Sequence, residues 1–337
     1  MLLSPTQKPN PQSFLTPQSI FLHWQTFALL GVFFLVRIIS FFTADHLILQ
    51  GILVFLLLLA FGTMYFLNPA WAWYMLLGEV LLGGSGHLLE LFGLSVRTIF
   101  LIAFLTFWHI HALSEKTLRH RLRINHSLFY VFIPLWILLL IAAANGALNG
   151  HDGQRILQDL LPFLFFTLLL PAYHLIHDEK SQALLVRLVL VFILGSAIFS
   201  LATFVYYSVG WGVIHDTFYQ WYRDVAMGKI TDTGTGFFRI VLPEHLLMVP
   251  IGLIISSLLM KNERHNGWWY FFLGATLLVL VLNLSRAYAL AFVGGLLVLK
   301  ISHAWKRWLT VSCGTLLATV LLFTSVHFLA SRGTSFG

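Results

Sequence analysis

Residues 282–295, LNLSRAYALAFVGG, place one arginine inside a run of apolar side chains. Arg286 separates two apolar stretches, 267–284 and 287–302, which are both short and nearly continuous. A membrane-spanning helix needs about 20 mostly apolar residues, and a charge within it is costly enough to indicate a function. The stretch therefore predicts two short spans that meet at a polar turn carrying Arg286.

The composition of the whole chain agrees with a lipid environment. Of its 337 residues, 58 % are hydrophobic and only 10 % are charged, and the mean hydropathy is +0.85. A soluble domain carries about 25 % charged residues, so this chain cannot cover its surface with polar groups in water. The sequence predicts an all-α polytopic membrane protein.

Eleven apolar runs are read as spans, which predicts about 11 transmembrane helices in this chain and 12 in a full-length protein. The runs are 20–42, 47–67, 70–88, 93–113, 127–148, 158–176, 183–207, 239–260, 267–284, 287–302 and 308–330. They form a single transmembrane domain, 20–337, after a polar N-terminal tail, 1–19. The longest connection, 208–238, is predicted to be an extracytoplasmic loop, and 331–337 to be the start of a second, truncated one.

The basic residues set the predicted orientation. The segment EKTLRHRLRIN, 115–125, is the densest basic loop, and the positive-inside rule puts it in the cytoplasm. Alternation from there makes the N-terminus cytoplasmic and puts most other Lys and Arg loops on the same side. The formal net charge of +7 is thereby explained by loop positions, and no nucleic-acid partner is expected.

Ionisable residues gather near the predicted outer ends of the spans. In GTGFFRIVLPEHLLMVPIG, 234–252, Arg239 opens the predicted eighth span and Glu244 and His245 follow the helix-breaking Pro243. In one interpretation these residues only form an ordinary helix start at the membrane interface. The same interpretation makes Arg286 an arginine whose side chain reaches the lipid headgroups. The alternative is a catalytic site made of Arg239, Arg286, Glu244 and His245, in which the carboxylate or the imidazole acts as a base.

A second group on the same predicted side comprises Arg37, Glu79, Glu90 and Arg97. Glu79 and Glu90 flank the glycine-rich turn GGSGH at 83–87. The favoured interpretation of this segment is a turn whose polar groups are hydrogen-bonded, and the alternative is that it shapes a groove facing lipid.

The aromatic side chains of WGVIHDTFYQWYRD, 211–224, permit two interpretations. A belt at the membrane interface is the commoner one. The other is stacking on sugar rings, with glycan contacts predicted for Trp211, Tyr219, Trp221, Tyr222 and Arg223.

Several chemistries have no motif in this chain. There is no GxxxxGK[ST] phosphate loop and no HEXXH pair, and His109 and His111 do not share a helix face. We therefore expect neither a metal nor another cofactor.

The segment LNLSRAYALAFVGGLLVL, 282–299, resembles the Ser-Arg segment of the O-antigen ligase superfamily, which includes O-antigen polymerases. The order of elements is similar too, with a long outer loop, then FFRIVLPEHLLMVPIGL, a short turn and the Ser-Arg segment. The resemblance covers about residues 180–337. It implies a GT-C-like fold of about twelve spans in the bacterial inner (cytoplasmic) membrane.

The resemblance also implies an activity, namely metal-independent, inverting transfer of a glycan from an undecaprenyl-diphosphate carrier to a saccharide or lipid-core acceptor. The family's diphosphate-binding arginines correspond to Arg239 and Arg286. The family's histidine base lies in a large outer loop, expected here to begin near Ser331 and to continue past Gly337. Ligases often have an Asn-containing turn near the proline of the eighth span, whereas this chain has Pro243, Glu244 and His245 there.

Three alternatives stay open besides the ligase. An O-antigen or exopolysaccharide polymerase would use the same donor, a transporter would use the charges as a substrate path, and a non-catalytic envelope-assembly protein would lack the outer-loop histidine. The sequence shows no inverted repeat of the kind that many transporters have. The ligase hypothesis requires that Arg239 and Arg286 converge, beside membrane lipids, on one site for a lipid-linked diphosphate.

Overall fold

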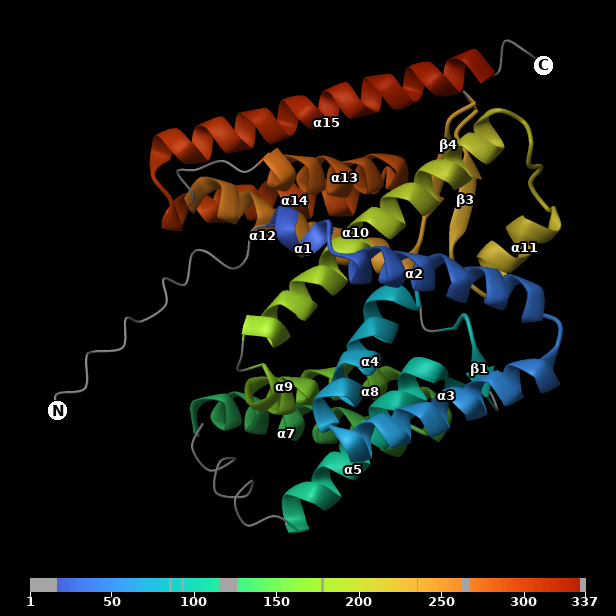
Figure 1. Ribbon diagram of the computed structural model, residues 1–337, viewed down its shortest axis with the longest axis vertical. Helices are drawn as coiled ribbons and strands as arrows, with labels where there is room; N and C mark the ends of the chain where they lie inside the picture. Colours follow the sequence, from blue (N-terminus) through green and yellow to red (C-terminus); the bar gives the residue numbers. More distant parts are fainter. Residues whose placement is uncertain are drawn as a thin grey trace, which may run out of the picture. The chain divides into compact units, whose positions relative to one another are not determined.

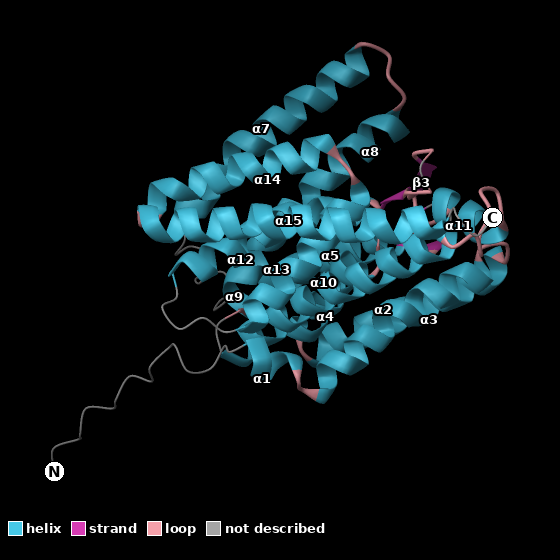
Figure 2. Cartoon of the chain, turned by 90° about the horizontal axis from the view of Figure 1, so that it is seen from above, coloured by secondary structure: helices cyan, strands magenta, loops and turns pink. Residues whose placement is uncertain are grey.

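A computed structural model describes residues 17–84, 87–91, 94–114, 126–176, 179–234, 236–261 and 267–333. The described chain is largely helical, with two short two-stranded sheets (Figure 2). It divides into two compact units, which are considered separately: residues 1–50, 78–89 and 183–337, and residues 51–77 and 90–182. Most of the predicted N-terminal tail, the basic loop 115–125 and residues 334–337 lie outside the described residues.

The first unit contains the segments that carry the predicted site. Its helices are α1 (Pro17–Phe21), α2 (Trp24–Thr43), α10 (Glu179–Ser208), α11 (Thr217–Asp224), α12 (Met248–Lys261), α13 (Gly267–Asn283), α14 (Arg286–Leu299) and α15 (Trp305–Gly333), with 3-10 turns η2 (Pro243–Leu247) and η3 (Lys300–Ser302). Helices α12, α13 and α15 pack side by side, and α14 packs on α12 (Figures 1 and 2).

Glycines bring α12 and α14 close together. A Cβ atom at Gly252 would lie 2.8 Å from the Phe292 ring, and one at Gly295 would lie 2.2 Å from Leu253. Small residues allow such contacts between membrane helices, because they let the two backbones approach. Gly252 and Gly295 therefore lie at this helix contact, whereas a Cβ at Gly294 would meet nothing within 4 Å.

The second unit contains the N-terminal and middle helices. They are most of α3 (Leu47–Leu67) and α4 (Pro69–Leu82), then α5 (Val96–Ser114), α7 (His126–Leu148), α8 (Gly153–Leu164), η1 (Phe165–Leu168) and α9 (Leu169–Leu175), with the hairpin β1 (Glu90–Leu91) and β2 (Leu94–Ser95). Aromatic rings hold α3 against α5, because Phe61 stacks on Phe100 with ring centroids 4.6 Å apart.

The all-α prediction is confirmed, and the helices have the character of a membrane protein. Five described helical segments are long and apolar enough to cross a membrane: Trp24–Thr43, Leu47–Leu67, Glu179–Ser208, Pro243–Lys261 and Trp305–Ala330. Large apolar side chains lie on the outside of these segments, for example Leu47, Phe66 and Leu329. Such a surface suits lipid better than water, since contiguous apolar patches on soluble monomers are small.

Three examples show where the bounds of the predicted spans differ from the elements of the structure. The third run, 70–88, is helical only to Leu82, because Gly83 and Gly84 end α4. The sixth run, 158–176, is divided into α8, η1 and α9, and α8 already begins at Gly153. The eighth run begins as strand β4 (Phe238–Val241), so Arg239 does not open a helix. Pro243 follows this strand and starts the 3-10 turn η2, a position that suits its fixed φ and missing N–H.

The predicted loop 208–238 has a folded structure of its own. It contains α11 and strand β3 (Lys229–Asp232), which pairs antiparallel with β4 from Lys229↔Val241 to Asp232↔Phe238. Asp216 caps α11, because its carboxylate accepts hydrogen bonds from the Tyr219 amide at 2.6 Å and the Tyr207 hydroxyl at 3.1 Å. Figure 1 shows α11 beside the β3–β4 hairpin.

Candidate functional site

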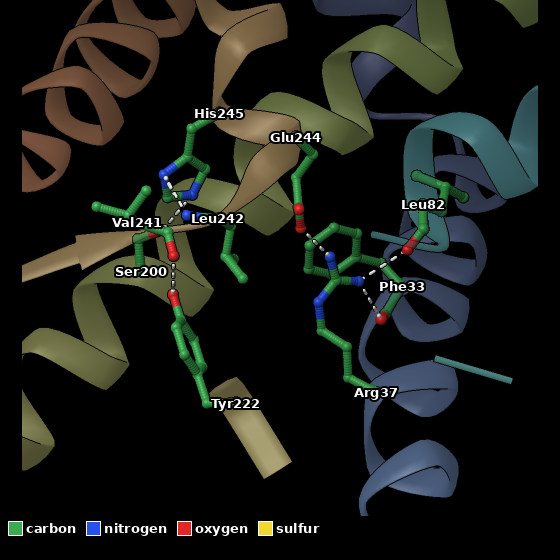
Figure 3. A network of polar contacts seen from close by, with 9 residues as sticks. All are labelled: Phe33, Arg37, Leu82, Ser200, Tyr222, Val241, Leu242, Glu244 and His245. Atoms are coloured by element: carbon green, nitrogen blue, oxygen red, sulfur yellow. Dashed lines mark hydrogen bonds and ion pairs between the residues drawn. The ribbon is translucent and has the colours of Figure 1, made fainter. Parts of the chain in front are cut away.

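A buried ion pair lies between α2 and the 3-10 turn after β4. Arg37 Nη2 donates to Glu244 Oε1 at 3.0 Å, and the exposed fractions of the two side chains are only 4 % and 3 % (Figure 3). Arg37 Nη1 donates to the backbone oxygens of Phe33 and Leu82, at 3.1 and 2.7 Å. The guanidinium also lies 3.5 Å from the centroid of the Phe33 ring. Arg37 therefore has the several partners that a buried cation requires.

The glycine turn after α4 covers this ion pair. Gly84 has a φ of +64°, and a Cβ atom there would lie 3.5 Å from Glu244 Oε1 and 3.6 Å from Arg37 Nη2. Glycine adopts this left-handed conformation without steric cost. The end of α4 thus contributes the backbone carbonyl of Leu82, and Gly84 after it packs tightly against the ion pair.

His245 is enclosed completely and is linked to three parts of the chain. Its Nε2 lies 3.1 Å from Ser200 Oγ on α10, and its Nδ1 lies 3.3 Å from the Leu242 amide nitrogen and 3.1 Å from Asn283 Nδ2. Its side chain has no exposed surface. We name Arg37, Ser200, Glu244, His245 and Asn283 the buried polar centre.

The buried polar centre does not fit the catalytic roles that the sequence suggested for Glu244 and His245. Both ring nitrogens of His245 already have partners, and one oxygen of Glu244 is taken by Arg37. Neither group is exposed to a substrate that arrives from outside. Glu244 Oε2 and Asn283 Oδ1 are buried and have no hydrogen-bond partner among the described residues.

Arg239 joins the buried polar centre to the turn between α13 and α14. Its Nε donates to the backbone oxygen of Asn283 at 2.7 Å. Asn283 ends α13, Leu284 has a left-handed φ of 48°, and Arg286 begins α14. The helix break that the sequence predicted at Arg286 is therefore confirmed, and Arg239 lies at it.

Arg286 lies at an uncapped helix N-terminus. Its side chain is exposed, and no hydrogen bond or ion pair to it is found within the described ranges. Ser285 is the N-cap residue of α14, but its side chain accepts no hydrogen bond from the first turn. We name Arg239, Arg286 and the N-terminus of α14 the basic rim.

Geometry limits how far apart the two arginines of the basic rim can be. Consecutive Cα atoms are about 3.8 Å apart, so the Cα of Arg286 lies within about 11 Å of that of Asn283. The Arg239 guanidinium is bonded to the Asn283 carbonyl. The Arg239 guanidinium and the backbone of Arg286 therefore both lie at the α13–α14 turn.

The five predicted glycan-contact residues occupy different environments. Trp211 is 72 % exposed, and Tyr219 is partly buried. Trp221 and Tyr222 belong to the apolar core around Phe204 and Ile240, so their rings offer no face to a sugar, and the prediction for these two is corrected. Their burial follows from amphipathic α11, whose inner side chains cover the hairpin and the end of α10.

The polar atoms of Trp221 and Tyr222 have partners within this core. Trp221 Nε1 donates to Ser40 Oγ at 3.1 Å, and the Tyr222 hydroxyl donates to the Val241 oxygen at 3.2 Å (Figure 3). Burial raises the pKa of Tyr222 well above its usual value, and the charge on Glu244 raises it further. This hydroxyl is therefore a neutral structural donor at physiological pH.

Arg223 is exposed and pairs with its neighbour in sequence. Its Nε and Nη2 donate to the two carboxylate oxygens of Asp224 at 2.7 and 2.8 Å. This pairing raises the pKa of Arg223 and lowers that of Asp224. A charge that already has a partner is a weaker candidate for binding a ligand than Arg286, for which the described residues provide no partner.

The main contact that sequence reasoning missed is the one between Arg37 and Glu244. The sequence placed the two residues in separate groups, and they are 207 positions apart along the chain. No local pattern indicates such a pairing. The only hint was that both are charges within apolar runs, for which a partner is expected.

The described residues contain no group of three or more His, Cys, Asp or Glu side chains that could hold a metal ion. Comparison of the chain with protein-family models, curated proteins and solved structures found no match. The similarity to the O-antigen ligase superfamily therefore stays a hypothesis drawn from the residues quoted above.

Proposed function

We propose that this chain transfers a glycan from an undecaprenyl-diphosphate carrier to a saccharide or lipid-core acceptor. In this proposal the chain has eleven spans of a GT-C-like fold in a bacterial inner membrane, with a cytoplasmic N-terminus. The diphosphate binds at the basic rim, on the extracytoplasmic side. Arg239 and Arg286 are the diphosphate-binding residues.

One observation carries the proposal, namely the hydrogen bond from Arg239 Nε to the Asn283 oxygen. It brings an arginine from strand β4 to the turn on which Arg286 stands. The Arg239 guanidinium and the uncapped N-terminus of α14, which begins with Arg286, then lie at the same turn, and the described residues supply no carboxylate to neutralise either arginine. A guanidinium binds phosphate oxygens in pairs, and helix N-termini favour anions.

The chemistry of the transfer explains why fixed cations are useful. The bond between the anomeric carbon and the diphosphate oxygen breaks, and its electron pair leaves with the diphosphate. An acceptor hydroxyl oxygen forms the new bond to the anomeric carbon and gives up its proton to a base, which the resemblance implies is a histidine of the outer loop that begins near Ser331. Preorganised guanidiniums would stabilise the charge that develops on the leaving group.

Because the carrier is a lipid, a site at the end of two short helices is accessible from the bilayer. Such a position also accounts for an arginine within an apolar stretch. Ligase and polymerase differ only in the acceptor, which the basic rim does not select.

Replacing Arg286 by Ala tests the proposal. Purified protein in proteoliposomes would be given a lipid-linked glycan donor and a saccharide acceptor, and product formation would be measured. We expect at least about a 100-fold loss of rate for Arg286→Ala and for Arg239→Ala, as for other removed oxyanion donors.

Arg187→Ala is the matched control, because Arg187 is an arginine of the same unit that donates to Gln25 and has no part in the predicted site. It should keep its activity, and all three variants should insert into membranes. Full activity of Arg286→Ala would refute the assignment of the diphosphate site. Uptake of substrate without bond formation would favour a transporter.

A further inference from the structure

His245 is held so that its two ring nitrogens have fixed and different roles. A backbone amide can only donate, so the Leu242 N–H at 3.3 Å makes Nδ1 an acceptor. The Asn283 group facing Nδ1 must then be the NH2 group, as its Nδ2 at 3.1 Å requires. The proton of the neutral ring is consequently on Nε2, which donates to Ser200 Oγ at 3.1 Å.

These contacts fix the side chain of Asn283 at the last position of α13. Nδ2 of Asn283 is bound to His245, while the backbone oxygen of the same residue accepts the hydrogen bond from Arg239 Nε at 2.7 Å. The carbonyl at a helix end is not fixed by a complete set of helical hydrogen bonds. The link to His245 therefore supplies an orientation that the helix alone does not.

The residues on either side of His245 strengthen this arrangement. Glu244 is anchored by Arg37 at 3.0 Å, and Pro243 restricts the backbone before it. Met248 begins α12 directly after the 3-10 turn. The ring of His245 thus has little freedom to move away from Asn283.

We infer that His245 is a positioning residue, which holds Asn283 and thereby places the Arg239 guanidinium in the basic rim. The effect on transfer rests on the proposed function, whereas the effect on Arg239 itself does not. His245 gives and takes no proton from a substrate in this role. Its contribution is an acceptor at the Nδ1 position.

Two amide substitutions separate the two ring nitrogens. In His245→Asn, the side-chain oxygen can occupy the position of Nδ1 and accept from Leu242 and Asn283. In His245→Gln, the longer side chain places its amide near Nε2 and leaves the Nδ1 position empty. Both variants lose the imidazole ring. A difference between them therefore reports the effect of a hydrogen-bond acceptor at the Nδ1 position.

The reactivity of Arg239 is the measurement that does not depend on activity. Full-length protein in detergent would be treated with phenylglyoxal, and modification of each arginine would be followed by mass spectrometry. We expect Arg239 to react several-fold faster in His245→Gln than in the wild type, and His245→Asn to stay near the wild-type rate. Arg223, which does not contact the network, is the internal reference.

Transfer kinetics give the second readout. We expect kcat to fall about ten-fold or more in His245→Gln, which would match a lost contribution of about 1.4 kcal/mol to the barrier. His245→Asn should stay within a few-fold of the wild type. A wild type without transfer activity would count against the proposed function, while the phenylglyoxal comparison would still decide on positioning.

If a His245 variant does not fold, Asn283→Leu replaces it. This change removes the Nδ2 donor and keeps a similar volume, so it should also raise the reactivity of Arg239. Equal modification of Arg239 in the wild type and in every folded variant would overturn the inference. So would an equal loss of activity in His245→Asn and His245→Gln with unchanged Arg239 reactivity, because that result would indicate a base.

Discussion

The buried polar centre and the basic rim contain the same kinds of residue in opposite surroundings. Arg37 is buried and has one carboxylate, two carbonyl oxygens and an aromatic face as partners. Arg286 is exposed, and the described residues provide it with no partner. Arg239 stands between them, with its Nε bound to a backbone oxygen.

This difference separates structural charges from charges that are available to a ligand. A buried ion must be paired, because an unpaired charge in a medium of low dielectric is very unfavourable. Arg37 and Glu244 meet this condition by pairing with each other through Glu244 Oε1. Of Arg37, Arg239 and Arg286, the two arginines of the basic rim keep guanidinium nitrogens for which the described residues provide no partner.

The largest effect is expected from breaking the buried ion pair. Arg37→Met would leave the Glu244 carboxylate buried without its cation, which typically destabilises a protein by about 3–5 kcal/mol. The free energy of unfolding can be measured by thermal or denaturant unfolding in detergent. A loss below about 1 kcal/mol would contradict a structural role for the pair.

The double variant Arg37→Met/Glu244→Met is the control for this experiment. It removes both charges, so most of the lost stability should return. Recovery would show that the two residues are coupled through their charges. Equal destabilisation of the single and double variants would indicate that packing dominates at this site.

Gly84→Ala is expected to have a smaller effect on the same region. Its φ of +64° is unfavourable for alanine by about 1–2 kcal/mol, and the new methyl group would lie against the ion pair. Gly78→Ala is the matched control, because Gly78 lies within α4 and has nothing within 4 Å of its would-be Cβ. That change should stabilise the helix by up to about 1 kcal/mol.

Tyr222→Phe tests the contact between α11 and the hairpin. Loss of the hydrogen bond to the Val241 oxygen should cost about 1 kcal/mol. The raised pKa of Tyr222 means that its folded form favours the neutral phenol. Its stabilising effect is therefore complete below the unfolded pKa of about 10 and is lost as the pH rises further. Between pH 8 and 11, the free energy of unfolding should fall less steeply with pH in Tyr222→Phe than in the wild type.

The smallest effect is expected at the exposed pair of Arg223 and Asp224. Arg223→Ala should leave the unfolding midpoint unchanged at pH 7, because exposed ion pairs are screened by solvent. The pKa of Asp224 is lowered in the folded protein. Any contribution of its carboxylate to the free energy of unfolding is therefore present above the unfolded pKa and is lost as the pH falls through the folded pKa. A clear loss of stability at pH 7 would show that this pair is less exposed than the structure has it.

Helix positions were largely predictable from the sequence, as two examples show. The run 47–67 has the bounds of α3, and the break predicted at the turn NLSR lies between Asn283 and Arg286. Long apolar runs and polar interruptions are local signals, which explains this agreement. Residues 239–241 were wrongly predicted as the start of a span, because a short apolar-rich run suits a strand equally well and only pairing with β3 decides.

The candidate site was predictable in its residues but only partly in their roles. Arg239 and Arg286 were predicted to converge, and the hydrogen bond to Asn283 brings Arg239 to the turn that carries Arg286. Glu244 and His245 were predicted as reacting groups, although their neighbours leave them buried and occupied. Neither Arg37 nor Ser200 is close to them in sequence.

The amino-acid sequence by itself determined the helical membrane class, most helix ends and the few ionisable residues within apolar surroundings. Hydrophobicity, glycine and proline act on neighbouring residues, so these features can be recognised along the chain. The tertiary structure alone decided which ionisable groups have partners, because burial and pairing depend on segments up to 207 positions apart. As a result, Arg37 is enclosed together with Glu244, whereas Arg286 is exposed at the start of α14.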